Sequence, residues 1–556
     1  MSSEPASHEA HIFTTPVEPP LVLQDPDAAN WADRADIVTI GFGSAAAVAG
    51  LQAREQGASV LAVDRFGGGG TTAICGGIVY AGGTRYQHAA GYQDTAEDMY
   101  KYLHFEGMAV EDETLKAYCD SSADNLEWLS KYGVKFGSNV YSHSTNYPPD
   151  DYQLYYSGME KARPEVAYVA PRGHRTVGKG MTGKNYWTAL RESAFHQGVR
   201  LRQHSPVRRL VMDSNGRVIG LECQVIPQRY WKQHDALYQR VTPYRPLNGE
   251  RGEQAVQDCL ALEASIPQER ILIRADKAVI IAAGNYTNNL KFLGRYRPEF
   301  ERCYKEIVRM GTMGDDGSGV ELGLSAGGEL ACMDAAVLSR PTYPPLAYVT
   351  GALVNSDGLR YKNEDANYSV LGQATSEQKD YAAWLIIDSA TYWKGIRQLL
   401  PPKEMFSLFG APAFLNILFG GTKKAKTLEE LARKCGMAPD HQLLATVAAY
   451  NEGVANGRDP LGKRVENQGA ITKGPFYAIN MSLRNKWNMS SGMPYGGLKV
   501  DERTGALVRA DGSAIPGLYG AGRCTVGMSS RTTFSGLSLG DTIFSGRRAA
   551  RSALQD

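Results

Sequence analysis

The sequence predicts an α/β fold in which a parallel sheet is covered by helices. Three observations support this. Residues 35–40 form a short β-branched run that meets two glycines and continues into a helix of small residues. A second apolar run, residues 59–64, ends in an acid. Near the other end of the chain, residues 515–523 again read as a strand followed by glycines, and a helix follows. Strands that alternate with helices in this way are typical of a parallel sheet.

The first glycine turn fits a dinucleotide. Gly41 allows the tight turn, Gly43 lets the backbone approach a pyrophosphate, and Ala46 occupies the position at which the helix must pack closely on the strand. The free N–H groups and the dipole at a helix N-terminus favour a phosphate there. Asp64, at the end of the second strand, can accept hydrogen bonds from ribose hydroxyls. The turn alone also fits any strand–helix connection, but its flanking elements favour dinucleotide binding.

The composition excludes several classes of protein. The 556 residues include 60 Lys and Arg against 59 Asp and Glu, so the chain lacks the field that attracts nucleic acid or anionic lipid. No apolar run approaches the roughly 18 residues that cross a bilayer. The eight cysteines form no CxxC pair, which argues against structural zinc, an iron–sulfur cluster and c-type haem. We therefore expect no metal, no nucleic-acid partner, no integral membrane segment and a cytoplasmic location with reduced thiols.

The same patterns predict the domain organisation. Residues 1–30 contain prolines and acids without the features of a signal peptide, and we expect a loose arm. Residues 31–295 form the first part of the dinucleotide-binding domain, and residues 481–556 return to it. Residues 296–480 form an inserted substrate domain. No motif in the polar insertion of residues 227–268 indicates a role.

From Asp36 to Ala553 the chain resembles the family of FAD-dependent fumarate reductases and 3-ketosteroid dehydrogenases. The resemblance implies a Rossmann-like FAD-binding domain, bound to FAD by both ends of the chain, with an inserted α+β domain that caps the substrate. No second GxGxxG motif is visible, so we expect an external electron acceptor. The motifs that match, in order, are Gly41-x-Gly43, Asp64, Cys75-Gly-Gly77, Ala282-Ala-Gly284, Gly314–Gly319, Gly358–Glu364, Gly496-Gly497, Gly517–Gly522 and Ser538–Asp541.

The resemblance also implies a set of FAD contacts along these motifs. They are Gly41, Gly43, Ser44, Ala45, Asp64, Arg65, Thr71, Thr72, Cys75, Gly76, Gly77, Val207, Ala283, Gly284, Asn285, Gly522, Arg523, Ser538 and Leu539.

Within the family, the chain resembles the 3-oxosteroid Δ4-dehydrogenases most. Tyr368 stands where fumarate reductases of this family have a proton-donating arginine, and Tyr495 lies where they place a histidine before Gly-Gly. A dicarboxylate would find little positive charge here apart from Arg340. Ser535 and Gly536 match the Ser-Gly pair of the Δ4 enzymes. Thr533 departs from them, because they have a tyrosine there, and this leaves the regiochemistry open.

Desaturation next to a ketone requires removal of an α proton and a β hydride. The site must stabilise an enolate by hydrogen bonds to the carbonyl oxygen and must supply a base. We expect Tyr368 to act as base or proton relay, and Ser535 with the Gly536 N–H to contact the carbonyl. Tyr343 and Tyr495 are further candidates. With 30 tyrosines in the chain, each phenol also fits simple packing.

The sequence therefore predicts an FAD-dependent dehydrogenase that acts on CH–CH groups. Its expected partners are a small apolar ketone, for which we expect a 3-ketosteroid desaturated at Δ4 or Δ1, and an external electron acceptor. Three alternatives stay open. The same site fits an ene-reductase running in reverse, a desaturase of a smaller cyclic ketone such as a cyclohexanone, or an electron carrier without a substrate cavity.

Overall fold

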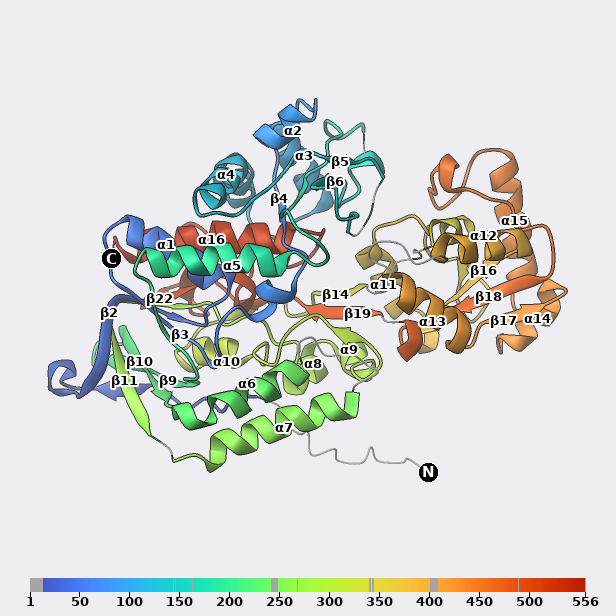
Figure 1. The fold of residues 1–556 in the computed structure, drawn as a ribbon. Coiled ribbons are helices and arrows are strands. Elements are labelled where there is room, and N and C mark those ends of the chain that lie inside the picture. Colours follow the sequence, from blue (N-terminus) through green and yellow to red (C-terminus); the bar gives the residue numbers. More distant parts are fainter. Residues whose placement is uncertain are drawn as a thin grey trace.

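A nine-stranded sheet organises the larger of two lobes in the computed structural model (Figure 1). The structure describes residues 14–143, 145, 147–162, 164–241, 249–267, 269–339, 342, 345–400, 409–488 and 490–555. The strands run in the order β1-β9-β10-β11-β2-β3-β8, with β22 also paired to β11 and β21 to β22. Their bounds are β1 Leu21–Leu23, β2 Trp31–Ile40, β3 Val60–Val63, β8 Arg200–Arg202, β9 Val207–Asp213, β10 Val218–Gln224, β11 Arg270–Ile281, β21 Ala506–Val508 and β22 Ala514–Gly520.

Four strands of this sheet, β22, β11, β2 and β3, are parallel neighbours. Their carboxyl ends therefore meet at one edge of the sheet. Ligands of open α/β sheets bind outside that edge.

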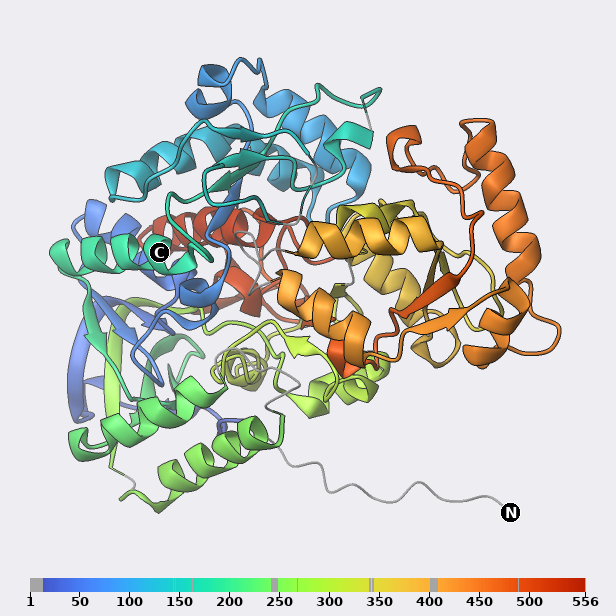
Figure 2. The ribbon, with the colours of Figure 1, turned by 45° about the vertical axis from the view of Figure 1, so that its right-hand side comes forward.

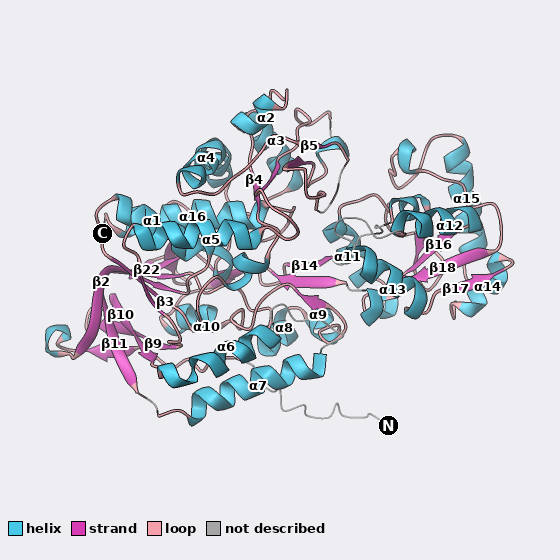
Figure 3. Ribbon diagram, viewed as in Figure 1, coloured by secondary structure: helices cyan, strands magenta, loops and turns pink. Residues whose placement is uncertain are grey.

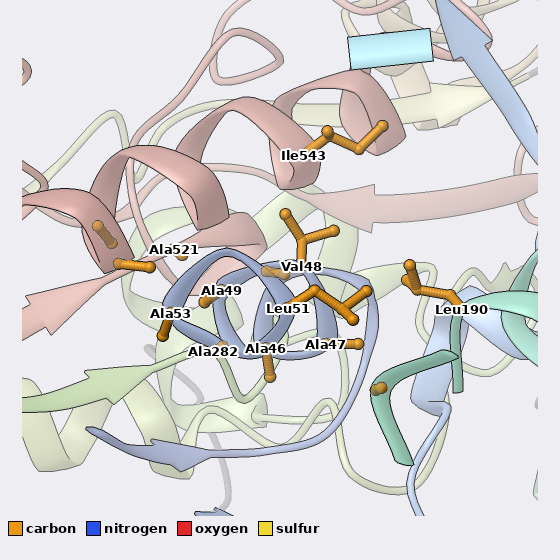
Figure 4. Close-up of a cluster of buried hydrophobic side chains, with 14 of the residues drawn as sticks. Ala46, Ala47, Val48, Ala49, Leu51, Ala53, Leu190, Ala282, Ala521 and Ile543 are labelled. Atoms are coloured by element: carbon orange, nitrogen blue, oxygen red, sulfur yellow. The ribbon is translucent and has the colours of Figure 1, made fainter. Parts of the chain in front are cut away.

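Three helices cover one face of the sheet, as Figure 3 shows: α1 Ser44–Glu55, α5 Gly183–His196 and α16 Leu537–Ala553. Figure 4 shows the small side chains of α1 packed towards Ile543 of α16 and Leu190 of α5. A Cβ on Gly546 would lie 2.7 Å from the Ala45 carbonyl oxygen. Only small residues allow α1 and α16, from opposite ends of the chain, to approach so closely.

A helical region with a four-stranded sheet lies above α1 and α16 in Figure 1. Its sheet runs in the order β4-β7-β6-β5, and Gly536, at the start of α16, accepts a hydrogen bond from the Tyr80 N–H of β4. The elements are β4 Ile78–Tyr80, α2 Arg85–Ala89, α3 Ala96–Glu106, α4 Asp112–Lys131, β5 Val140–Tyr141, β6 Leu154–Tyr155 and β7 Gly173–Arg175.

The second lobe lies to one side of the first in Figures 1 and 2 and contains its own sheet, β15-β16-β18-β17. Its hydrophobic core draws on residues from Ala347 onward, whereas the inserted domain was expected from residue 296. Phe300 and Ile307, which follow residue 296, pack in the hydrophobic core of the main sheet. The lobe contains β15 Ala352–Val354, α11 Tyr368–Ser376, β16 Trp384–Ile387, α12 Ser389–Leu399, α13 Ala411–Phe419, β17 Lys423–Ala425, α14 Leu428–Lys434, α15 Leu443–Ala455 and β18 Phe476–Asn480.

The chain forms short elements on either side of the second lobe. β19 pairs with β12 and β14, and β13 pairs with β20. The bounds of these short elements are α8 Leu290–Tyr296, α9 Pro298–Arg302, β12 Val308–Arg309, α10 Ser318–Ser325, β13 Leu330–Ala331, β14 Ala336–Ser339, β19 Ser491–Pro494 and β20 Gly497–Leu498.

One segment differs from the sequence-based expectation, and for a second segment the sequence offered no structural expectation. The described part of the expected loose arm is attached to the first lobe, since β1 pairs with β9 and Glu18 forms an ion pair with Arg270. The polar insertion forms two helices, α6 Trp231–Arg240 and α7 Gly249–Ser265. Within the described ranges, no helix combines the length and apolarity that a bilayer crossing requires.

Candidate functional site

A cavity of about 940 Å³ lies where the carboxyl ends of the parallel strands meet the N-terminus of α1. The turn after β2 shapes it. Gly41 has a φ of +94°, and a Cβ there would lie 2.7 Å from the Ala282 carbonyl oxygen, so the fold itself requires glycine. At Gly43 a Cβ would meet nothing closer than 3.5 Å. Glycine at this second position therefore keeps the cavity open and does not relieve backbone strain.

Most of the expected cofactor contacts line this cavity. They are Gly41, Gly43, Ser44, Ala45, Asp64, Arg65, Thr71, Thr72, Val207, Ala283, Gly284, Gly522 and Arg523.

Six expected contacts, all within the described residues, do not line the cavity: Cys75, Gly76, Gly77, Asn285, Ser538 and Leu539. Their protein contacts explain this. The Cys75 thiol donates to the Thr72 carbonyl oxygen at 3.2 Å, and a Cβ on Gly77 would lie 2.7 Å from the Thr182 backbone. Leu539 is buried in the core between α1 and α16.

Asp64 holds the loop around the cavity through its carboxylate. It accepts hydrogen bonds from the N–H groups of Phe42 at 2.8 Å and Phe66 at 2.7 Å. Burial raises the pKa of Asp64, although these N–H groups oppose that rise. Each carboxylate oxygen has more than one lone pair, so Asp64 can still accept from a ligand hydroxyl.

Asp315 joins four chain segments around the cavity. One oxygen accepts from the Asn285 N–H at 3.0 Å and from Arg523 at 2.9 Å. The other accepts from the Thr71 hydroxyl at 2.6 Å and the Thr312 N–H at 2.8 Å. Asp315 lies in the matched Gly314–Gly319 motif, which was the available signal for it. Other residues line the cavity without having been expected there, such as Thr15, Phe66 and Tyr238.

The residues of this cavity fit a dinucleotide. The helix N-terminus and the open space at Gly43 suit a pyrophosphate, and Asp64 suits a ribose. Arg523 contributes a cation at the side of the cavity formed by the C-terminal part of the chain.

A second cavity, of about 860 Å³, lies between the loop that follows β5 and the second lobe. Tyr368, Asn367 and Thr342 line it from one side, and Tyr156 and Met159 from the other. Asn367 caps α11 by accepting from the Ser369 N–H, which places Tyr368 at the first position of that helix. Arg340 and Tyr343 lie outside the described residues.

Two phenol–hydroxyl pairs meet on the segment before α16. The Tyr495 hydroxyl donates to the Thr533 hydroxyl at 3.2 Å, and the Tyr155 hydroxyl donates to Ser535 at 2.8 Å. Tyr368 packs against the cluster that contains Tyr495. The structure thus brings Tyr368, Tyr495 and Ser535 into one region. Tyr155 was not among the expected catalytic residues, because its tyrosine-rich stretch fits a packed loop as well as a cavity mouth.

Burial keeps the phenol of Tyr495 neutral. It raises the pKa of Tyr495, and the opposing effects of the Thr533 hydroxyl and Arg523 do not cancel this rise. A neutral phenol can donate a hydrogen bond to a carbonyl oxygen.

Gly536 has a φ of +99°, and a Cβ there would lie 2.9 Å from the Tyr80 nitrogen, so no side chain can replace glycine at this turn.

Glu160 is a buried acid beside the second cavity. It accepts a hydrogen bond from the Tyr80 hydroxyl at 3.0 Å and another from the Gly158 N–H at 3.0 Å. Burial raises the pKa of Glu160 from about 4.5 to about 7, against the opposing effect of Arg172. The carboxyl group is therefore protonated in the folded chain at pH values where it is ionised in the unfolded chain.

This shift predicts a pH dependence of stability. Because the folded state binds the proton more tightly, the contribution of Glu160 is complete below pH 4.5 and is lost as the pH rises to about 7. We expect the wild type to lose roughly 3 kcal/mol relative to Glu160→Gln across this window. Urea unfolding of both proteins from pH 4.5 to 8 measures the difference. Glu466→Gln, an exposed residue of the same cavity, is the control, and parallel profiles for wild type and Glu160→Gln would contradict the assignment.

Comparison with known proteins agrees with the cavity geometry. A family model described as an FAD binding domain matches residues 36–539. A 3-oxo-5-alpha-steroid 4-dehydrogenase of Comamonas testosteroni is 33% identical over 528 residues, which cover 92% of this chain and 97% of that protein. A probable fumarate reductase of Shewanella frigidimarina is 25% identical over 543 residues, which cover 96% of this chain and 76% of that protein.

A solved structure shows the same similarity in three dimensions. The 3-ketosteroid-Δ4-(5α)-dehydrogenase of Rhodococcus jostii RHA1, crystallised with 4-androstene-3,17-dione, superposes with a TM-score of 0.79 at 30% identity. The match covers 97% of this chain and all of that chain. The predicted α/β fold with an FAD-binding domain is confirmed.

Proposed function

The chain belongs to the family of FAD-dependent fumarate reductases and 3-ketosteroid dehydrogenases, and from this premise we propose that it introduces a C=C bond next to the carbonyl of a 3-ketosteroid. It is an FAD-dependent oxidoreductase of the group that acts on CH–CH bonds. The finer assignment to a steroid ketone rests on the second cavity and on the relatives that are named for such substrates.

The first cavity would hold FAD. The N-terminus of α1 and Gly43 would take the pyrophosphate, Asp64 the ribose, and Arg523 would lie towards the second cavity, since it also contacts Met493 beside Tyr495. When bound, the flavin supplies the acceptor for the β hydride of the substrate. The second lobe would close over the substrate and exclude water.

Tyr368 of the second cavity and Tyr495, in the cluster against which Tyr368 packs, would handle the carbonyl and the α proton. Tyr495 would turn its one O–H from the Thr533 hydroxyl to the carbonyl oxygen, with the Thr533 hydroxyl donating to the phenol in return, and would so stabilise the enolate that forms when the α proton leaves. Tyr368 would take or relay that proton, and Ser535 with Tyr155 offers a second hydroxyl pair. Thr533 stands where the Δ4 enzymes have a tyrosine. The hydrogen bond between Tyr495 and the threonine hydroxyl would supply a phenol near that position.

The pairing of the basic side chains in the second cavity favours an uncharged substrate. Among its described lining residues the two Lys or Arg side chains are Lys161 and Arg464. Arg464 pairs with Asp365 at 3.0 Å, and Lys161 donates to the Ser142 carbonyl oxygen. A dicarboxylate would have to displace these partners, whereas a ketone needs only a hydrogen-bond donor.

Anaerobic mixing of the holoenzyme with a saturated 3-ketosteroid tests the proposal. We expect the visible absorption of the oxidised flavin to bleach, with one equivalent of unsaturated ketone formed. Bleaching by cyclohexanone but by no steroid would reassign the substrate to smaller rings, and bleaching by succinate alone would reassign it to dicarboxylates. Absence of bleaching with every ketone would refute the proposal.

A further inference from the structure

The two helices of the insertion, α6 and α7, lie along the lower edge of the first lobe in Figures 1 and 2. They pack against each other and, through Leu237, Val256 and Cys259, against Phe66 of the cavity loop and Met313. The insertion is therefore attached to the loop that follows β3.

Aromatic rings make the first connection. The Phe66 ring stacks on His234 at 4.7 Å and meets the Tyr238 ring at 4.5 Å. Both Phe66 and Tyr238 line the cavity, and Phe66 is two residues beyond Asp64. Tyr238 is thus a residue of the insertion that forms part of the cavity wall.

A buried ion pair makes the second connection. Arg65 donates to Glu263 of α7 at 2.7 Å and to Asp316 at 3.1 Å. His234 approaches the same Glu263 oxygen at 3.0 Å. Burial alone would raise the pKa of Glu263, but Arg65 and His234 bring it to about 2, so the carboxylate is ionised at neutral pH. The insertion thereby holds Arg65 in place.

The same cluster does not suit a metal ion. Ligand atoms of His234, Cys259 and Glu263 lie within 4.8 Å of one another. However, the Arg65 guanidinium bonds to Glu263 and reaches to 3.9 Å from the Cys259 sulfur. This fixed cation neutralises the carboxylate and would repel a second cation.

The order of groups along the cavity identifies what the insertion faces. The α1 N-terminus suits the pyrophosphate and Asp64 the adjoining ribose, so the base lies beyond Asp64. Phe66 and Tyr238 stand there, and aromatic faces suit a flat heterocycle. We infer that the insertion completes the adenine subsite of FAD, with Tyr238 as a wall of that subsite and Glu263 as the residue that positions Arg65 and Phe66.

This inference rests on FAD binding and not on the steroid proposal, so it is tested without any ketone. Apoprotein is titrated with FAD, by quenching of flavin fluorescence, and with ADP, by calorimetry. ADP carries only the adenosine half. Tyr238→Ala should raise Kd for both ligands by roughly 5- to 150-fold, the range for loss of one base–aromatic stack, and Tyr238→Phe should restore it. Gln239→Ala, its exposed neighbour on α6, should leave both Kd values unchanged.

Glu263→Gln tests the positioning role. It should weaken FAD and ADP in parallel, because Arg65 loses its anionic partner and the Phe66 loop loosens. Circular dichroism of each apoprotein confirms folding; should Tyr238→Ala fail to fold, Tyr238→Leu keeps the bulk and removes only the aromatic face. If the folded Tyr238 variants bind FAD and ADP within twofold of wild type, the inference is overturned. A loss confined to FAD, with ADP unchanged, would also overturn it.

Discussion

Tyr368→Phe should lower kcat by about 100- to 10,000-fold, the usual contribution of a positioned proton-transfer group. The substitution removes one hydroxyl and leaves the ring packed beside Tyr495. FAD should stay stoichiometric, because Tyr368 lines the second cavity and not the first. Steady-state rates with a 3-ketosteroid and an artificial electron acceptor, together with flavin content from absorbance, measure both quantities.

Tyr348→Phe is the matched control for this prediction. Tyr348 lies in the core of the same lobe, and its buried hydroxyl has no hydrogen-bond partner in the described structure. Its loss should leave kcat within twofold of the wild type. If Tyr368→Phe also turns over normally, Tyr368 has no part in proton transfer, and a loss on Tyr495→Phe would move that role to Tyr495.

Gly43→Ala should weaken FAD binding by roughly 5- to 150-fold, which corresponds to about 1–3 kcal/mol of steric overlap. The apoprotein tolerates the methyl group, since its nearest neighbours would be 3.5 Å away. The bound pyrophosphate does not, because it needs close approach of the backbone at this glycine. Titration of apoprotein with FAD gives the affinity, and thermal unfolding without FAD should be unchanged.

Gly67→Ala controls for mutation of a glycine in the neighbouring loop. A Cβ at Gly67 meets nothing within 4 Å, and the residue does not line the described cavity. Its FAD affinity should equal that of the wild type. Stoichiometric, tight FAD in Gly43→Ala would show that this turn does not carry the pyrophosphate.

The elements that local patterns determine were predictable from the sequence. The turn at Gly41 and Gly43, the strand that ends at Asp64 and the late strand before Gly522 all lie where their residues predict. Each depends on neighbours within a few positions of the chain. Alternation of strands and helices then places the carboxyl ends at one edge of the sheet without further information.

Contacts between distant segments were not predictable in the same way. Glycine clusters illustrate the reason. Gly43 leaves space at the cavity, but Gly76 and Gly77 leave space for Tyr147 and the Thr182 backbone. A sequence shows that a side chain is absent, and it does not show what occupies the space.

The second lobe and the insertion show the same limit of local patterns. The inserted domain was expected to start at residue 296, yet Phe300 belongs to the core of the main sheet. Only the fold brings Tyr238 to the first cavity and Tyr155 to the Ser535 hydroxyl.

The pairing of α1 with α16 has a consequence for how the holoprotein is made. Gly522, Arg523 and Thr542 complete a cavity whose other wall begins at Gly41. While the nascent chain is still on the ribosome, its early glycine turn has no opposite wall, so flavin must load after translation has passed these residues. Prematurely terminated products that lack α16 should therefore remain colourless however much flavin the cell supplies.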